Sequence, residues 1–180
     1  MSKPVSSSAA LPIAHVVLRL LIVLNWLMAA GLVALLIFMP YAMPFFMRSG
    51  EWINNPTPYP DADRLVLGMR AIVALGLIST PLHYLILKRL LAMVDTVRGG
   101  DPFIAANAER LQAIGWALLA IQMLSITIGA IANAISTLVH PLHLSAGFSI
   151  SGWLAVLLTF LLARVFAAGT LMRDDLEGTV

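Results

Sequence analysis

The sequence contains no cysteine. A chain without thiols cannot form a disulfide, bind a metal through thiolates or use a thiol as a nucleophile. The absence excludes these metal sites and enzyme classes, and it leaves the redox environment of the protein unspecified.

Charged residues are also scarce. They make up 11% of the 180 residues, whereas soluble domains average about 25%. The formal net charge of +2 comes from 11 basic and 9 acidic side chains. An excess this small cannot form an electrostatic surface for DNA or RNA, so we expect no direct binding of nucleic acid.

Hydrophobic residues, in contrast, make up 60% of the chain, and the mean hydropathy is +0.92. About 20 apolar residues in a helix cross the ~30 Å hydrocarbon core of a bilayer, and backbone groups in lipid must bond within the helix. We therefore predict an all-α, polytopic membrane protein, a four-transmembrane-helix bundle that forms one membrane domain over residues 1–180. The expected segments are spans at about 13–39, 65–87, 111–135 and 150–172, an outer loop at about 44–64, and a cytoplasmic hairpin at about 88–110.

Basic residues predict the orientation of the spans. The link after the third span has no basic residue, whereas the connection between the second and third spans has four: Lys88, Arg89, Arg98 and Arg110. Cytoplasmic loops of membrane proteins carry an excess of Lys and Arg. The bias places this connection, and with it both termini, in the cytoplasm.

The connection itself has the pattern of a helical hairpin. Gly99 and Gly100 are expected to end the helix that continues from the second span. Asp101 is a good N-cap residue and Pro102 suits the first position of a helix. The pattern predicts that the next helix begins at Pro102 and continues into the third span.

Few polar side chains enter the predicted spans. All nine carboxylates fall in loops or at helix ends, which disfavours a carrier that couples transport to protons or sodium. Asn25 and Gln122 lie at similar predicted depths in the first and third spans. They can join two helices through a hydrogen bond, or they can line a ligand site.

Three arginines also enter the spans. Arg19 and Arg164 lie close enough to helix ends for their guanidinium groups to reach the lipid headgroups or a lipid phosphate. Arg70 is the best candidate for a functional charge inside the membrane. Its expected partners near the outer side are Asp61, Asp63 and Asn133.

No catalytic or cofactor motif is found in the sequence, so we expect no enzymatic activity and no cofactor. The four histidines are divided between the two predicted faces: His15 and His83 on the inner one, His140 and His143 on the outer one. A zinc site needs three or four converging ligands, so we expect no metal site.

Two stretches of sequence go beyond the general pattern of a membrane protein. The first is Gly100-Asp101-Pro102-Phe103, followed by Asn107, by Arg110 and Leu111, and by Ile114-Gly115-Trp116. The second is the tail, which contains Phe166, Gly169 and Leu171 and ends in Arg173-Asp174-Asp175-Leu176-Glu177-Gly178-Thr179-Val180. Together they resemble the domain-of-unknown-function 2975 family of small four-helix membrane proteins of bacteria.

The resemblance implies a location in the bacterial inner membrane but no established activity. Members of that family are commonly encoded beside a small helix-turn-helix DNA-binding protein, which implies a membrane partner that captures or regulates a transcription factor. Both motifs are predicted on the cytoplasmic face, so one soluble partner can touch both. Acidic groups of the tail, Asp174, Asp175 and Glu177, can pair with arginines of that partner, or with Arg98 and Arg110 of the hairpin.

Two other interpretations remain open. The motifs can serve only to cap helices and to fasten the cytoplasmic end of the bundle. Alternatively, the protein is a small permease or efflux component in which Asn25, Arg70 and Gln122 line a path. Beyond the lipid bilayer and a cytoplasmic protein, the sequence also leaves the formation of a homo-oligomer open.

Overall fold

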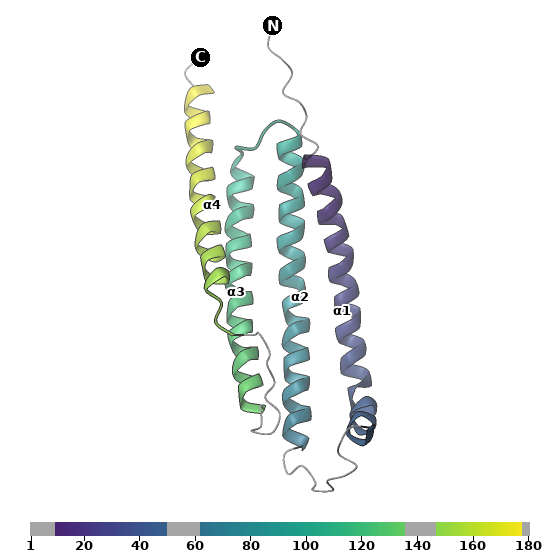
Figure 1. Ribbon diagram of the computed structural model, residues 1–180. Helices are drawn as coiled ribbons and strands as arrows, with labels where there is room; N and C mark the ends of the chain where they lie inside the picture. Colours follow the sequence, from purple (N-terminus) through teal and green to yellow (C-terminus); the bar gives the residue numbers. More distant parts are fainter. Residues whose placement is uncertain (1–9, 50–61, 136–146, 178–180) are drawn as a thin grey trace. The chain divides into compact units, whose positions relative to one another are not determined.

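The computed structural model describes residues 10–49, 62–135 and 147–177 of the chain. Within these ranges it contains no strand and has four helices (Figure 1): α1 (Ala10–Ser49), α2 (Ala62–Arg98), α3 (Ala105–Ile135) and α4 (Ile150–Glu177). The predicted all-α fold with four long helices is confirmed.

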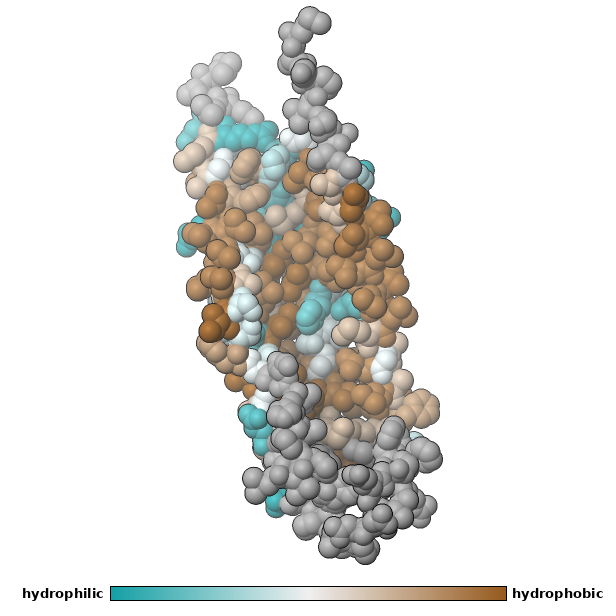
Figure 2. Space-filling view, in the orientation of Figure 1, coloured by the Kyte–Doolittle hydropathy of each residue, from teal (hydrophilic) through white to brown (hydrophobic). Residues whose placement is uncertain are grey.

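All four helices are long and apolar enough to cross a bilayer. The segments that meet this condition are Ala10–Tyr41, Val66–Arg98, Ala105–Ile135 and Ile150–Arg173. Among the described residues, 32 large apolar side chains are exposed, whereas only seven apolar residues are buried. Apolar side chains cover most of the visible surface of the helices (Figure 2). Lipid can cover such a surface at no cost, while water cannot, so the chain is a multi-pass membrane protein.

The helices are divided between two compact units. One unit comprises Met1–Asn25, Leu82–Ala120 and Ile150–Val180, and the other comprises Trp26–Pro81 and Ile121–Ser149. The first unit therefore contains the start of α1, the end of α2, the start of α3 and all of α4. The second contains the remaining parts of α1, α2 and α3.

The first unit is packed around one face of α3. Its buried apolar residues are Leu111, Ile114, Ala117, Val156 and Ala163. Gly115 lets α4 approach closely, because a Cβ at this position would lie 3.0 Å from Cζ of Phe160. The Trp116 ring meets the Phe160 ring edge-on, with centroids 5.4 Å apart. These contacts hold α3 and α4 side by side.

The second unit also depends on a glycine. A Cβ at Gly68 of α2 would overlap Cγ2 of Ile135 in α3, so only glycine fits this crossing. Met39 of α1 and Ala132 of α3 are buried. The same unit contains Gly76, whose added Cβ would be in ordinary contact with Leu32, at 3.7 Å.

The predicted outer loop is shorter in the structure. Helix α1 continues to Ser49 and α2 begins at Ala62, so helix occupies both ends of the segment 44–64. The residues between them lie outside the described part of the chain. The last turns of α1 change direction in Figure 1, as expected where Pro40 and Pro44 remove backbone N–H donors and crowd the preceding turn.

Candidate functional site: the hairpin and the tail

The end of α2 is closed by a Schellman motif. Gly100 has a φ of +85°, which favours glycine. Its N–H donates to the carbonyl of Val97 at 3.1 Å, and the N–H of Asp101 donates to the carbonyl of Thr96 at 3.1 Å. Both bonds satisfy carbonyls that the helix end leaves open. The predicted end of the helix at Gly99 and Gly100 is confirmed.

The start of α3 differs from the prediction. We expected Asp101 as the N-cap and Pro102 as the first helical residue, but α3 begins at Ala105. Asp101 lies too far before this start for its carboxylate to cap the helix, and it pairs with Arg173 of α4 instead. The side-chain amide of Asn107 donates to the Pro102 carbonyl at 2.8 Å instead, which fixes the residues before the helix.

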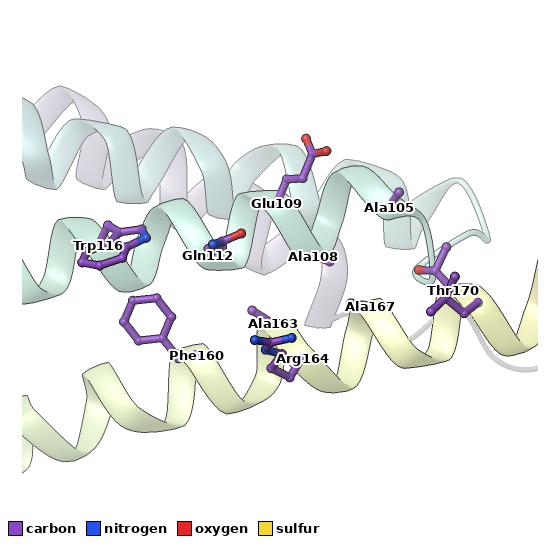
Figure 3. A pocket seen from close by; sticks show the side chains of 11 residues that line it. Ala105, Ala108, Glu109, Gln112, Trp116, Phe160, Ala163, Arg164, Ala167 and Thr170 are labelled. Atoms are coloured by element: carbon purple, nitrogen blue, oxygen red, sulfur yellow. The ribbon is translucent and has the colours of Figure 1, made fainter.

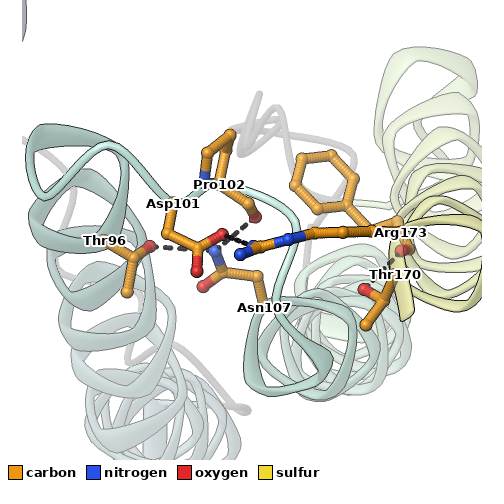
Figure 4. Close-up of polar contacts among 7 residues, drawn as sticks. Thr96, Asp101, Pro102, Asn107, Thr170 and Arg173 are labelled. Atoms are coloured by element: carbon orange, nitrogen blue, oxygen red, sulfur yellow. Dashed lines mark hydrogen bonds and ion pairs between the residues drawn. The ribbon is translucent and has the colours of Figure 1, made fainter. Parts of the chain in front are cut away.

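Asn107 is the centre of the hairpin. It is fully buried, at 0% exposure. Its amide also donates to Oγ1 of Thr96 at 2.8 Å, and the Thr96 hydroxyl donates to the carbonyl of Met93 at 2.7 Å. Nη1 of Arg110 donates to Oδ1 of Asn107 at 2.7 Å and to the carbonyl of Ala92 at 3.3 Å. Asn107 and Arg110 therefore fasten the start of α3 to the end of α2. Figure 4 shows Asn107 between Thr96 and Pro102.

Phe103 joins the hairpin to α4. Its ring centroid lies 5.3 Å from that of Phe166. A Cβ at Gly169 would lie 2.9 Å from Cδ1 of Phe103, so the ring rests directly on the backbone of α4. Despite these contacts, Phe103 remains 44% exposed. One side of the ring holds the tail in place while the rest of it stays accessible.

An ion pair completes the contact. Nη1 of Arg173 donates to Oδ1 of Asp101 across 72 positions of sequence (Figure 4). The two side chains are each 43% exposed. The sequence had suggested the reverse arrangement, in which acidic residues of the tail pair with Arg98 or Arg110 of the hairpin. Arg110 has its hydrogen bonds within the hairpin, and the pairing of the tail acids stays a prediction.

The residues of the two motifs thus separate into two groups. Asn107 and Arg110 act inside the hairpin, and Pro102 accepts one of their hydrogen bonds. The exposed edge consists of Gly100, Asp101, Phe103, Arg173 and Asp175, which we call the hairpin–tail surface. Asp174 and Glu177 belong to α4, but their side chains lie outside the described residues.

Sequence reasoning missed two features of this end of the first unit. The first is Thr96, a hydrogen-bond partner of Asn107. Its position one turn before Gly99 and Gly100 could have indicated that it takes part in the hairpin. Nε2 of His15 lies 3.4 Å from Oδ1 of Asp95, which links the start of α1 to the end of α2. His15 and Asp95 are far apart in the sequence, so no local motif joins them.

The intramembrane polar residues are divided between the two units. Asn25 and Gln122 are both buried, at 8% and 7% exposure, but they belong to different units. Their contact stays a prediction. Arg70 and Arg164 are exposed, and they too belong to different units. Among the residues described, no three histidine or acidic side chains converge on a point where a metal could bind.

Comparisons with known proteins identify a family, but its description names no activity. No curated protein and no solved structure matches the chain. The model of one family matches residues 50–180, which include the whole of the hairpin and the tail. The chain therefore belongs to the family described as protein of unknown function (DUF2975).

Proposed function

We propose that the chain is a non-enzymatic binding or regulatory module of the bacterial inner membrane, and that its hairpin–tail surface engages a small cytoplasmic protein. The observation that carries the proposal is the docking of the tail on the hairpin. Phe103 rests on Gly169, and Asp101 pairs with Arg173. These contacts assemble the two motifs of the sequence into one surface.

The basic residues near the hairpin support a cytoplasmic location for this surface and for the chain ends beside it. His15 near the start of α1 contacts Asp95 near the end of α2, and Arg173 near the end of α4 contacts the hairpin. Both ends of the described chain are therefore on the hairpin side of the first unit. The hairpin region is rich in basic residues, as cytoplasmic connections are.

The chemistry of the surface suggests the class of partner. The sides of the helices expose apolar residues that lipid covers, so a soluble protein can approach only at the helix ends. The tail brings three acidic residues to this end. A helix-turn-helix protein, the partner that the family resemblance implies, has a basic face for DNA. Acidic side chains can bind such a face and so compete with DNA.

The test is co-purification of the full-length protein with the helix-turn-helix protein encoded next to it. The informative variant carries Asp174→Asn, Asp175→Asn and Glu177→Gln, because it removes the acids and keeps Arg173. The matched control carries Glu51→Gln, Asp61→Asn and Asp63→Asn, which change the same residue types in the predicted outer segment.

We expect the tail variant to lose about tenfold or more of the captured partner, as the removal of a few charge-assisted contacts implies. The control should capture as much as the wild type. Added salt should weaken capture by the wild type, because the contact is electrostatic. Equal capture by the tail variant and the wild type would contradict the role given to the tail.

A further inference from the structure

A groove runs between α3 and α4 within the first unit (Figure 3). Its volume is about 770 Å³, and it is open along one side. Ala105 and Thr170 line it near the hairpin, while Trp116 and Phe160 line it at the other end. The volume is in the range of small-molecule sites, and the open side faces the surroundings of the helices.

Three polar side chains line the middle of the groove. They are Glu109 and Gln112 of α3 and Arg164 of α4. The Trp116 and Phe160 rings are in contact, and Gln112 and Arg164 each follow one turn closer to the hairpin. Gln112 and Arg164 are therefore at the same level, and Glu109 lies one turn, ~5 Å, nearer the hairpin.

The two charges of the groove do not neutralise one another. No hydrogen bond or ion pair joins Glu109 to Arg164 in the described structure. Figure 3 shows the Glu109 carboxylate pointing away from α4. Both side chains are exposed. Both charges are therefore available to a partner from outside the helices.

The level of Arg164 is that of lipid headgroups. The contacts of Asn107 with Thr96, and of Arg110 with Ala92, align α2 and α3 as antiparallel neighbours. Counting from these contacts places Lys88 and Arg89 of α2 close to the level of Gln112 to Trp116. Two further basic residues and an amphipathic tryptophan ring therefore share the level of Arg164, as is typical of a membrane interface.

The order of groups along the groove matches one class of lipid. From the inner end toward the hairpin, the groove presents aromatic rings, then Arg164 with Gln112, then Glu109. A phosphatidylethanolamine molecule presents acyl chains, then a phosphate, then an ammonium group. Arginine binds phosphate through charge-assisted hydrogen bonds, and a carboxylate accepts them from ammonium.

We propose that this groove is a binding site for a zwitterionic phospholipid with an ethanolamine headgroup. Arg164 and Gln112 bind the phosphate, and an acyl chain lies along Trp116 and Phe160. The Glu109 side chain turns toward the headgroup and its carboxylate binds the ammonium group. An anionic lipid such as phosphatidylglycerol satisfies Arg164 but leaves Glu109 without a cation. The site therefore prefers the zwitterionic lipid. The proposal is independent of the protein partner proposed above.

Native mass spectrometry of the full chain in detergent can test this preference. The probes are phosphatidylethanolamine and phosphatidylglycerol with the same acyl chains, added in equal amounts. We expect the wild type to retain the first over the second by about tenfold, the effect of one hydrogen bond to a charged group. Equal retention, or a preference for phosphatidylglycerol, would overturn the proposal.

Single substitutions separate the two charges. Glu109→Gln should abolish the preference and leave phosphatidylglycerol binding intact, whereas Arg164→Gln should reduce the retention of both lipids by about tenfold. Arg98→Gln, at an exposed arginine of α2 outside the groove, is the matched control and should behave as the wild type. An Arg164→Gln protein that binds both lipids normally contradicts the site.

A third variant fills the groove and keeps both Glu109 and Arg164, so it tests the site without changing any charge. Ala167 lines the groove and Ala168 does not, although both are in the same turn of α4. Ala167→Leu should block the groove and reduce phosphatidylethanolamine retention, and Ala168→Leu should not. If Ala167→Leu binds the lipid as well as Ala168→Leu does, the lipid lies elsewhere and the proposal is wrong.

Discussion

The ring of Phe103 rests on the backbone of Gly169, where a Cβ would lie only 2.9 Å from Cδ1 of the ring. This contact joins the hairpin between α2 and α3 to the last turns of α4. Phe103 also stacks near Phe166, so the hairpin and the tail are held by packing as well as by charge.

Gly169→Leu should displace the Phe103 ring. Overpacking of a close contact costs about 1–3 kcal/mol of unfolding free energy, and we expect a lower midpoint of thermal unfolding in detergent. Ala168→Leu is the control, because Ala168 is exposed.

The double variant Phe103→Ala, Gly169→Leu tests whether the clash with the Phe103 ring causes the loss of stability in Gly169→Leu. Once the ring is removed, the new side chain has space, so the two effects should not add. Strict additivity of the two changes would show that the destabilisation has another origin.

The ion pair between Asp101 and Arg173 should contribute little stability. Both side chains are 43% exposed, and exposed pairs contribute roughly 0.2–1 kcal/mol. Asp101→Arg and Arg173→Asp should each loosen the tail, and the double swap should restore its protection from protease. A swap that remains as cleavable as the single variants would show that the tail does not depend on this pair.

Asn107→Leu should be much more damaging than the loss of that ion pair. The substitution removes two amide donors and the acceptor for Arg110, inside a fully buried site. Each buried polar group left without its partner costs about 1–3 kcal/mol. We expect faster amide hydrogen exchange over residues 93–110 and a lower unfolding midpoint.

Asn133→Leu is the matched control for Asn107→Leu, since Asn133 is an exposed asparagine of the same helix. It should leave both measurements close to those of the wild type. Similar exchange rates in the two variants would mean that the Asn107 hydrogen bonds do not hold the hairpin.

The sequence predicted the positions of the helices more accurately than it predicted the contacts between them. The apolar runs are long enough that only membrane-spanning helices satisfy their backbone groups, so the four helices follow from the sequence. Gly99 and Gly100 also ended α2 as predicted, because the turn is built from neighbouring residues. These features depend on distances of a few residues along the chain.

The errors and omissions concern contacts between distant segments. Aspartate is a favoured N-cap residue, but the carboxylate of Asp101 pairs with Arg173, which lies 72 positions away in the sequence. Asn107 and Phe103 looked alike as motif residues, yet one is buried and the other is partly exposed. The groove with Glu109 and Arg164 depends on which faces of α3 and α4 meet, and no periodicity in either helix specifies that pairing.

The final prediction concerns the second unit. Gly68→Ala should destabilise the protein, because the new Cβ would overlap Cγ2 of Ile135 and lie 3.0 Å from its Cδ1. Overpacking of this kind costs roughly 1–3 kcal/mol. Gly31→Ala is the matched change in α1, where nothing lies within 4 Å of the added Cβ. Alanine is about 1 kcal/mol better than glycine inside a helix, so this control should be neutral or stabilising.

Relief of the overlap should rescue Gly68→Ala. Ile135→Ala removes both of the crowding atoms, so the double variant should be more stable than the sum of the two single effects implies. Thermal unfolding of the four proteins in one detergent makes the comparison. If Gly68→Ala is as stable as Gly31→Ala, α2 and α3 do not approach one another closely at Gly68 in the folded protein.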